Sequence, residues 1–185
     1  TYMTRSIGYN KLLEHLSISN IGKLINFSQW HPPFVELTTV PFYRIFGISA
    51  DIAVFSMNFI FLGILIFSVY GIGKILLNAK AGLLAVFIAT MYPFTYLLSR
   101  HYFLDFPLMA MVTAAIYFSL KSKQVEKWYN YLILAVLLAL SLLIKRTAVF
   151  FILPFVAYLI TSNKNKRYIL ILLVSGILLY PWYGA

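Results

Sequence analysis

The chain has 185 residues, of which 62% are hydrophobic and only 11% are charged, and its formal net charge is +10. Because a soluble domain usually carries about 25% charged residues, this composition excludes a water-soluble globular domain and predicts a protein whose solvent is lipid. The Lys and Arg residues form short clusters between apolar runs, which argues against a nucleic-acid-binding stripe. There is no cysteine for disulfides or thiolate metal sites. No signal peptide is visible, and we interpret the chain as a fragment of a longer protein, cut at both ends.

The first fifty residues differ from the rest of the chain. They begin with a polar-amphipathic stretch and end with an apolar run at 34–47 that Glu36, Pro41 and Arg44 interrupt. This run is too short and too polar to cross a membrane comfortably, so we expect an interfacial or re-entrant piece. Residues 1–50 are therefore expected to form part of a first outer loop with amphipathic or interfacial helices.

Residues 51–185 are expected to form a transmembrane helix bundle. The apolar runs in it are long and do not alternate with polar residues, which excludes strands. A span needs roughly 20 residues, so the fourth and fifth runs are short, and Pro93 predicts a kink in the second. The fold class is all-α integral membrane, a polytopic bundle with six predicted spans, at 52–77, 81–98, 104–120, 128–144, 148–160 and 168–183.

The positive charges predict which end of the bundle faces outward. One set of alternate loops carries eight Lys or Arg residues, whereas the other short loops carry three, namely Arg100, Lys145 and Arg146. The positive-inside rule places the first set in the cytoplasm. The three exceptions then share the outer face with residues 1–50.

Three polar clusters on this outer face are candidates for chemistry. In Gln29-Trp30-His31-Pro32-Pro33 the prolines stiffen the chain, so that His31 could donate a hydrogen bond to a phosphate or sugar; the alternative is a simple helix-start signal. In residues 100–105, a helical conformation would put His101 and Asp105 on one face, and a carboxylate at the membrane rim is a functional candidate. The alternative, compatible with the first, makes Asp105 the N-cap of the next helix.

The third cluster is Lys145-Arg146-Thr147. Adjacent cations that defy the positive-inside rule indicate an anionic partner. The alternative is snorkelling to lipid headgroups, with Thr147 as an N-cap. We interpret the acidic and histidine residues Glu14, His15 and Glu36 as solvated loop residues.

The order of these pieces resembles a known family. His31-Pro32-Pro33-Phe34 is followed by a stretch ending in Phe46-Gly47, then by Ser99-Arg100 with Asp105-Phe106-Pro107-Leu108, then by a run ending in Lys145, and finally by Pro181-Trp182-Tyr183. This order resembles the polytopic glycosyltransferases of the GT-C class, in the branch of the dolichyl-phosphate-mannose protein mannosyltransferases and the bacterial aminoarabinose transferases.

The resemblance implies an inverting transfer of a sugar from a polyprenyl phosphate donor to a protein, lipid or glycan acceptor, on the outer face of a plasma (inner) membrane. It implies that the catalytic Asp lies upstream of Thr1, so that residues 1–185 alone are inactive. His31, Arg100, Asp105, Lys145 and Arg146 are then the expected donor-binding residues, and Asp105 and His101 the candidate ligands for a divalent metal ion. Two other classes remain open, a multi-pass transporter and a non-catalytic membrane subunit. An acidic residue just after a preceding transmembrane helix would favour the enzyme.

Overall fold

The structure is a computed structural model, and every regular element in its described part is a helix. About half of the expected span at 148–160 and most of the one at 168–183 lie outside this part, and so does His31. The described residues are 2–14, 33–124, 128–153, 157, 174–177 and 179–180.

One long helix forms the axis of the molecule. It consists of α4 (Ala50–Met57), a π-helical turn η1 (Asn58–Leu62) and α5 (Gly63–Leu76). The Ser49 side chain caps its start by accepting a hydrogen bond from the backbone N–H of Ile52 at 3.1 Å. The 27 residues Ala50–Leu76 are long and apolar enough to cross a membrane, in agreement with the run predicted at 52–77.

The second run forms two helices with a sharp bend between them. α6 (Ala79–Met91) and α7 (Pro93–Ser99) meet at an angle of 62°, so the kink predicted at Pro93 is confirmed. Proline has no N–H to donate to the preceding turn, which ends the regular helix there. If this pair counts as one broken span, the described residues contain two candidate membrane spans, and otherwise one.

The remaining described helices follow in antiparallel order. α8 (Asp105–Gln124) has 20 residues, α9 (Trp128–Leu142) is apolar but has only 15, and a 3-10 turn η2 (Arg146–Ala148) comes next. The third and fourth predicted runs are therefore helical. Among the described residues, however, at most two of the six predicted spans meet the length and hydropathy that a membrane crossing needs.

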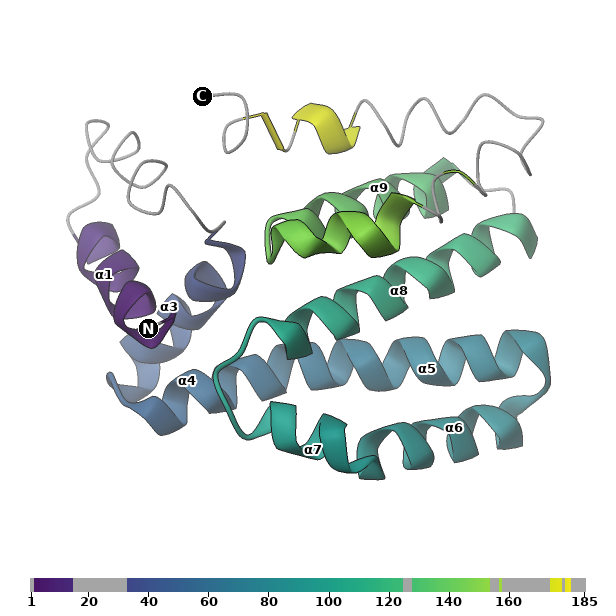
Figure 1. Cartoon of the computed structure of the whole chain (residues 1–185), viewed down its shortest axis with the longest axis horizontal. Coiled ribbons are helices and arrows are strands. Elements are labelled where there is room, and N and C mark those ends of the chain that lie inside the picture. The colour runs from purple at the N-terminus through teal and green to yellow at the C-terminus, as the bar shows by residue number, and fades with distance from the viewer. Residues whose placement is uncertain are drawn as a thin grey trace.

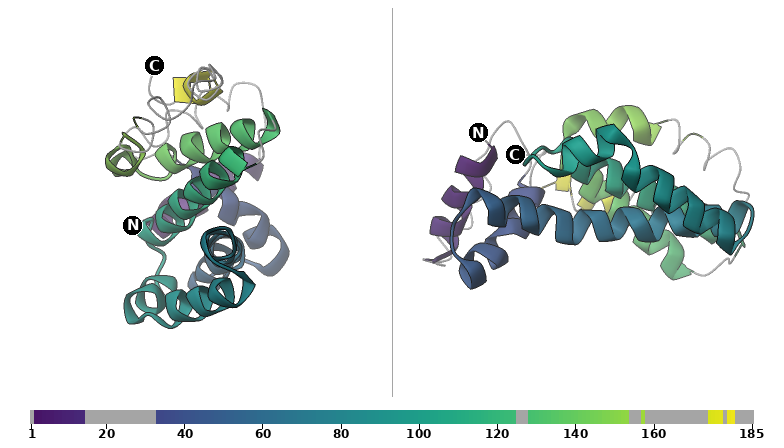
Figure 2. Two further views of the ribbon diagram at one scale, coloured as in Figure 1. Left: turned by 90° about the vertical axis from the view of Figure 1, so that its right-hand side faces the viewer. Right: turned by 90° about the horizontal axis from the view of Figure 1, so that it is seen from below.

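Two further helices lie at the α4 end of the long helix, as Figure 1 and the right-hand view of Figure 2 show. α1 (Tyr2–Glu14) packs against α3 (Phe34–Phe46), which ends at Gly47 with a φ of 87°. Since α5, α6, α8 and α9 alternate in direction (Figure 1), residues 100–104 and 143–145 lie at the same end as α1 and α3. The Leu77–Asn78 turn lies at the opposite end.

Glycines allow α5 and α6 to approach each other closely. A Cβ atom added at Gly73 would lie 2.6 Å from the Cα atom of Gly82, and one added at Gly82 would lie 2.7 Å from the carbonyl oxygen of Tyr70. Close backbone contact through small residues is how helices associate in lipid, where burial of apolar surface adds little driving force. α5 also packs along α8, and the core between these helices includes the fully buried Phe61 and Phe106.

Candidate functional site

An ion pair joins the start of α8 to the segment that follows α9. The ammonium Nζ of Lys145 donates a hydrogen bond to Oδ1 of Asp105 at 2.7 Å, across 40 residues of sequence. The Asp105 side chain is 53% exposed, and the Lys145 side chain is 31% exposed. A pair this exposed contributes only about 0–1 kcal/mol to stability. Stability alone is therefore a weak reason for placing these two charges at the ends of apolar helices.

The structure does not place Asp105 at the N-cap position. Asp105 is the first residue of α8, and the carbonyl oxygen of the preceding Leu104 accepts a hydrogen bond from the N–H of Leu108 at 3.0 Å. Asp105 thus lies in the first helical turn, where the positive end of the helix dipole favours an acidic residue. Its carboxylate bonds to Lys145 across the gap between two helices.

Lys145 occupies an extended link between α9 and η2. Its φ is −154°, and its carbonyl oxygen accepts a hydrogen bond from the N–H of Ala148 at 2.9 Å. No side chain caps η2, and Thr147 lies within this 3-10 turn, so the interpretation of Thr147 as an N-cap is wrong. Arg146, the first residue of η2, is exposed beside Lys145.

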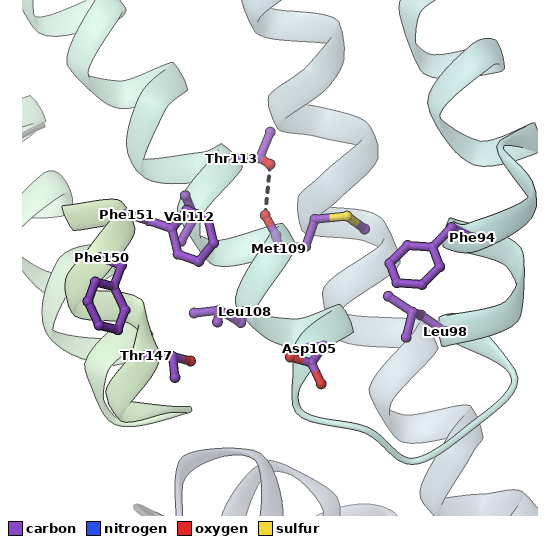
Figure 3. Close-up of a pocket in the computed structure, with 10 residues that line it drawn as sticks. All are labelled: Phe94, Leu98, Asp105, Leu108, Met109, Val112, Thr113, Thr147, Phe150 and Phe151. Atoms are coloured by element: carbon purple, nitrogen blue, oxygen red, sulfur yellow. Dashed lines mark hydrogen bonds between the residues drawn. The ribbon is translucent and has the colours of Figure 1, made fainter. Parts of the chain in front are cut away.

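A pocket opens beside this ion pair. Its volume is about 520 Å³, and Asp105 and Thr147 lie at one end of it, as Figure 3 shows. Aromatic rings stand on both sides, with Phe94 from α7 on one side and Phe150 and Phe151 on the other. Most of the wall is apolar, and the lining residues are Phe94, Leu98, Asp105, Leu108, Met109, Val112, Thr113, Thr147, Phe150 and Phe151. Asp105 is the charged member of this lining, and its hydrogen bond to Lys145 brings an ammonium group next to the pocket.

The structure does not bring Arg100 and His101 into this ion pair. The guanidinium of Arg100 donates to the Tyr96 hydroxyl at 3.0 Å and stacks over the Tyr96 ring. The His101 ring contacts the Phe103 ring, with centroids 5.5 Å apart. Residues 100–104 form a turn between α7 and α8, so the expectation that His101 and Asp105 share a helix face is wrong.

The described residues do not make a metal site. Within them, no three His, Asp or Glu side chains gather closely enough to hold an ion. Asp105 bonds to Lys145, and His101 stacks on Phe103, so the two candidate ligands are engaged elsewhere. We derive no step through a metal ion.

The segment that follows His31 docks near Lys145. His31 itself lies outside the described residues, but the backbone N–H of Phe34 donates to the carbonyl oxygen of Leu143 at 3.4 Å. Leu143 precedes Lys145 by two positions. The end of the Pro-Pro segment therefore lies beside the link that carries Lys145.

Glu36 is a buried carboxylate at the same end of the bundle. It belongs to α3 and is only 1% exposed, so the interpretation as a solvated loop residue is wrong. Its nearest counter-charge is the Arg5 guanidinium of α1 at 3.8 Å, and neither carboxylate oxygen has a hydrogen-bond partner among the described residues. Burial raises the pKa of Glu36 from 4.5 to about 7, although Arg5 acts in the opposite direction.

A buried hydroxyl network lies next to Glu36 on α3. The Thr39 hydroxyl hydrogen-bonds with the Tyr102 hydroxyl at 2.7 Å, and Ser56 of α4 donates to Thr39 at 3.2 Å. Burial raises the pKa of the Tyr102 phenol above its usual value. The network fixes the 100–104 turn against α3 and α4. The sequence contains a sign of this network, because Glu36, Thr39 and Tyr43 follow a helical spacing that places them on one face of α3.

Comparison with known proteins gives one match. A family model described as dolichyl-phosphate-mannose-protein mannosyltransferase matches residues 30–183, which is most of the chain. No curated protein and no solved structure gives a significant match.

Proposed function

Because the chain belongs to the dolichyl-phosphate-mannose-protein mannosyltransferase family, we propose that it transfers a sugar from a polyprenyl phosphate donor, dolichyl or undecaprenyl, to a protein, lipid or glycan acceptor. The observation that carries this proposal is the ion pair between Lys145 and Asp105, since Asp105 also lines an apolar pocket. The family is one of glycosyltransferases in membranes. The donor, the acceptor and the residue roles are the proposed part.

The chemistry of such a donor matches the site. A polyprenyl phosphate has its negative charge at the headgroup plane and its tail in lipid, so it needs a cation beside an apolar groove. Lys145 supplies the cation, and Phe94, Phe150 and Phe151 line the groove. Arg146 is exposed next to Lys145 and would add a planar group suited to phosphate oxygens.

Each charged residue then has a distinct role in transfer. The bond from the sugar to the phosphate oxygen breaks, and negative charge accumulates on the leaving phosphate, where Lys145 and Arg146 would stabilise it. Asp105 would act as a positioning residue, because its hydrogen bond fixes the Lys145 ammonium. The acceptor hydroxyl requires a general base, for which a carboxylate is the usual group.

The donor would be consumed on the outward side of a plasma (inner) membrane, with the α1 and α3 end facing out. The chain contains no cysteine, so single cysteines report topology without ambiguity. Lys11 of α1 and Lys80 at the start of α6 are both exposed. We expect an impermeant maleimide to label Lys11→Cys on intact cells and to label Lys80→Cys only after permeabilisation. Labelling of both on intact cells would contradict the topology.

Transfer itself is tested with the full-length protein in liposomes and a polyprenyl-phosphate-linked mannose labelled in the sugar. We expect saturable consumption of the donor, with release of polyprenyl phosphate and appearance of label in the acceptor. Liposomes without the protein are the control and should show no transfer. Movement of the intact donor across the bilayer would instead identify a transporter, and binding without turnover a non-catalytic subunit.

A further inference from the structure

A second cavity lies between α5 and α8, at the end of the bundle opposite Asp105. Its volume is about 420 Å³, and its lining includes Phe67, Tyr70, Gly71 and Lys74 from α5, and Tyr117 and Lys121 from α8. The proposed transfer reaction does not use this cavity. Its composition, with two cations, two phenols and an apolar wall, requires a separate explanation.

Among the residues that the structure describes, no carboxylate neutralises the two lysines of this cavity. None of the residues that line it is acidic, and in the described part of the chain neither Lys74 nor Lys121 forms an ion pair. The Lys121 ammonium lies over the rings of Tyr117 and Phe118, at 5.6 and 5.5 Å from their centroids. These contacts hold the ammonium near the cavity while leaving its charge uncompensated. Two such cations, from two different helices, favour an anion.

The shape of the cavity depends on Gly71. A Cβ atom added there would lie 2.8 Å from Cζ of Tyr117 and still closer to other atoms of that ring. Glycine therefore lets the Tyr117 ring lie directly against the α5 backbone, where it forms the floor of the cavity. Larger side chains near this end are turned outward, since Phe67 is 56% exposed and Leu77 is 77% exposed. The cavity thus adjoins a surface that suits lipid tails.

We propose that this cavity binds the phosphate headgroup of an anionic phospholipid, with Lys74 and Lys121 on the phosphate and the acyl chains along the exposed apolar side of α5. Basic pockets between membrane helices on the cytoplasmic side are suited to such headgroups, and the loop charges place this end in the cytoplasm. Tyrosines fit the same headgroup plane, where one end of the ring is apolar and the other is wet. A soluble phosphate would account for the lysines but not for the apolar wall.

The test measures lipids retained by the purified protein in mild detergent, by native mass spectrometry, during titration with phosphatidylglycerol or phosphatidylcholine. We expect the wild-type protein to retain phosphatidylglycerol selectively. Lys74→Gln combined with Lys121→Gln should weaken its apparent affinity about 30-fold, from a contribution of roughly fivefold for each lysine. Lys80→Gln is the matched control, since Lys80 is exposed at the same end but does not line the cavity.

Three results would overturn the proposal. One is equal retention of phosphatidylcholine by the wild-type protein, a measurement that does not depend on any variant folding. Another is unchanged affinity in the double Gln variant, or loss of affinity in the variant with Lys74→Arg and Lys121→Arg, which keeps both charges. The third is displacement of the lipid by millimolar inorganic phosphate, which would identify a soluble phosphate as the ligand. Sugar transfer is not part of the readout, so this test is independent of the proposed function.

Discussion

Asp105→Asn is expected to lower the rate of sugar transfer by the full-length protein about ten- to a hundredfold while leaving its thermal stability near that of the wild type. The variant loses the charged hydrogen bond that fixes the Lys145 ammonium at 2.7 Å. When a bound donor excludes water from the site, losing such a charged bond costs about 1.5–3 kcal/mol, which gives this range of rates if the bond acts in the transition state. Stability should change little, because an exposed ion pair contributes about 0–1 kcal/mol to it.

Asp51→Asn is the matched control for this variant. Asp51 is also an exposed carboxylate in the first turn of a helix, α4, so its loss removes the same favourable contact with a helix dipole. It has no ion pair among the described residues. If the two Asn variants transfer sugar equally well, the role of Asp105 is limited to stabilising the first turn of α8. Rates and unfolding midpoints should be measured on the same preparations.

The role of Lys145 is tested within the same series. Lys145→Gln should raise the apparent KM for the polyprenyl donor, because the ammonium would contact the donor phosphate. If Asp105 acts only by positioning Lys145, the variant that carries both substitutions should be no slower than Lys145→Gln alone. Additive losses of rate would show that Asp105 has a separate role. An unchanged KM for the donor in Lys145→Gln would show that Lys145 only extends to the lipid headgroups.

The second large effect concerns the pH dependence of stability at Glu36. Burial raises the pKa of Glu36 from 4.5 to about 7, so the folded protein holds a proton that the unfolded chain releases at lower pH. The free energy of unfolding should therefore fall as pH rises from about 4.5 to about 7 and then level off, by about 3 kcal/mol in total. Glu36→Gln keeps the size of the side chain and removes the titration.

Thermal unfolding at pH 5 and pH 8 measures this effect. The wild-type protein should unfold at a lower temperature at pH 8, and Glu36→Gln should lose most of that difference and be the more stable protein at pH 8. Asp51→Asn is again the control, since Asp51 is an exposed carboxylate on a neighbouring helix. Equal pH dependence in wild type and Glu36→Gln would show that the carboxylate is hydrated or firmly paired with Arg5.

The sequence predicted the helices well where local chemistry decides their limits. The apolar run predicted at 52–77 corresponds to the helix Ala50–Leu76, and Pro93 lies at the bend between α6 and α7. The start of α8 was equally predictable. The ring of Pro107 would clash with the carbonyl group of Phe103, four residues earlier, if Phe103 were helical. The same argument, applied to residues 100–104, would have excluded the shared face of His101 and Asp105.

The pairing of distant residues was harder to predict. The charge pattern placed Asp105 and Lys145 on one face, and the structure adds that they bond to each other rather than to Arg100. The burial of Glu36 depends on α1, which lies some thirty positions earlier and covers it only after the two helices pack. A single sequence contains no local signal for that contact, because isolated charges in amphipathic stretches are usually solvated.

The π-helical turn Asn58–Leu62 determines how α4 is rotated relative to α5 about their common axis. Each residue of a regular helix advances the side-chain direction by about 100°, and a π turn holds an extra residue without that advance. Ala53 and Met57 before the turn and Leu65 and Ser68 after it are all buried. Replacing the turn by regular α-helix would rotate α4 about the α5 axis, and α3 with Glu36 and Thr39 would turn with it. The angular position of α3 and α4 is thus set from inside the candidate membrane span.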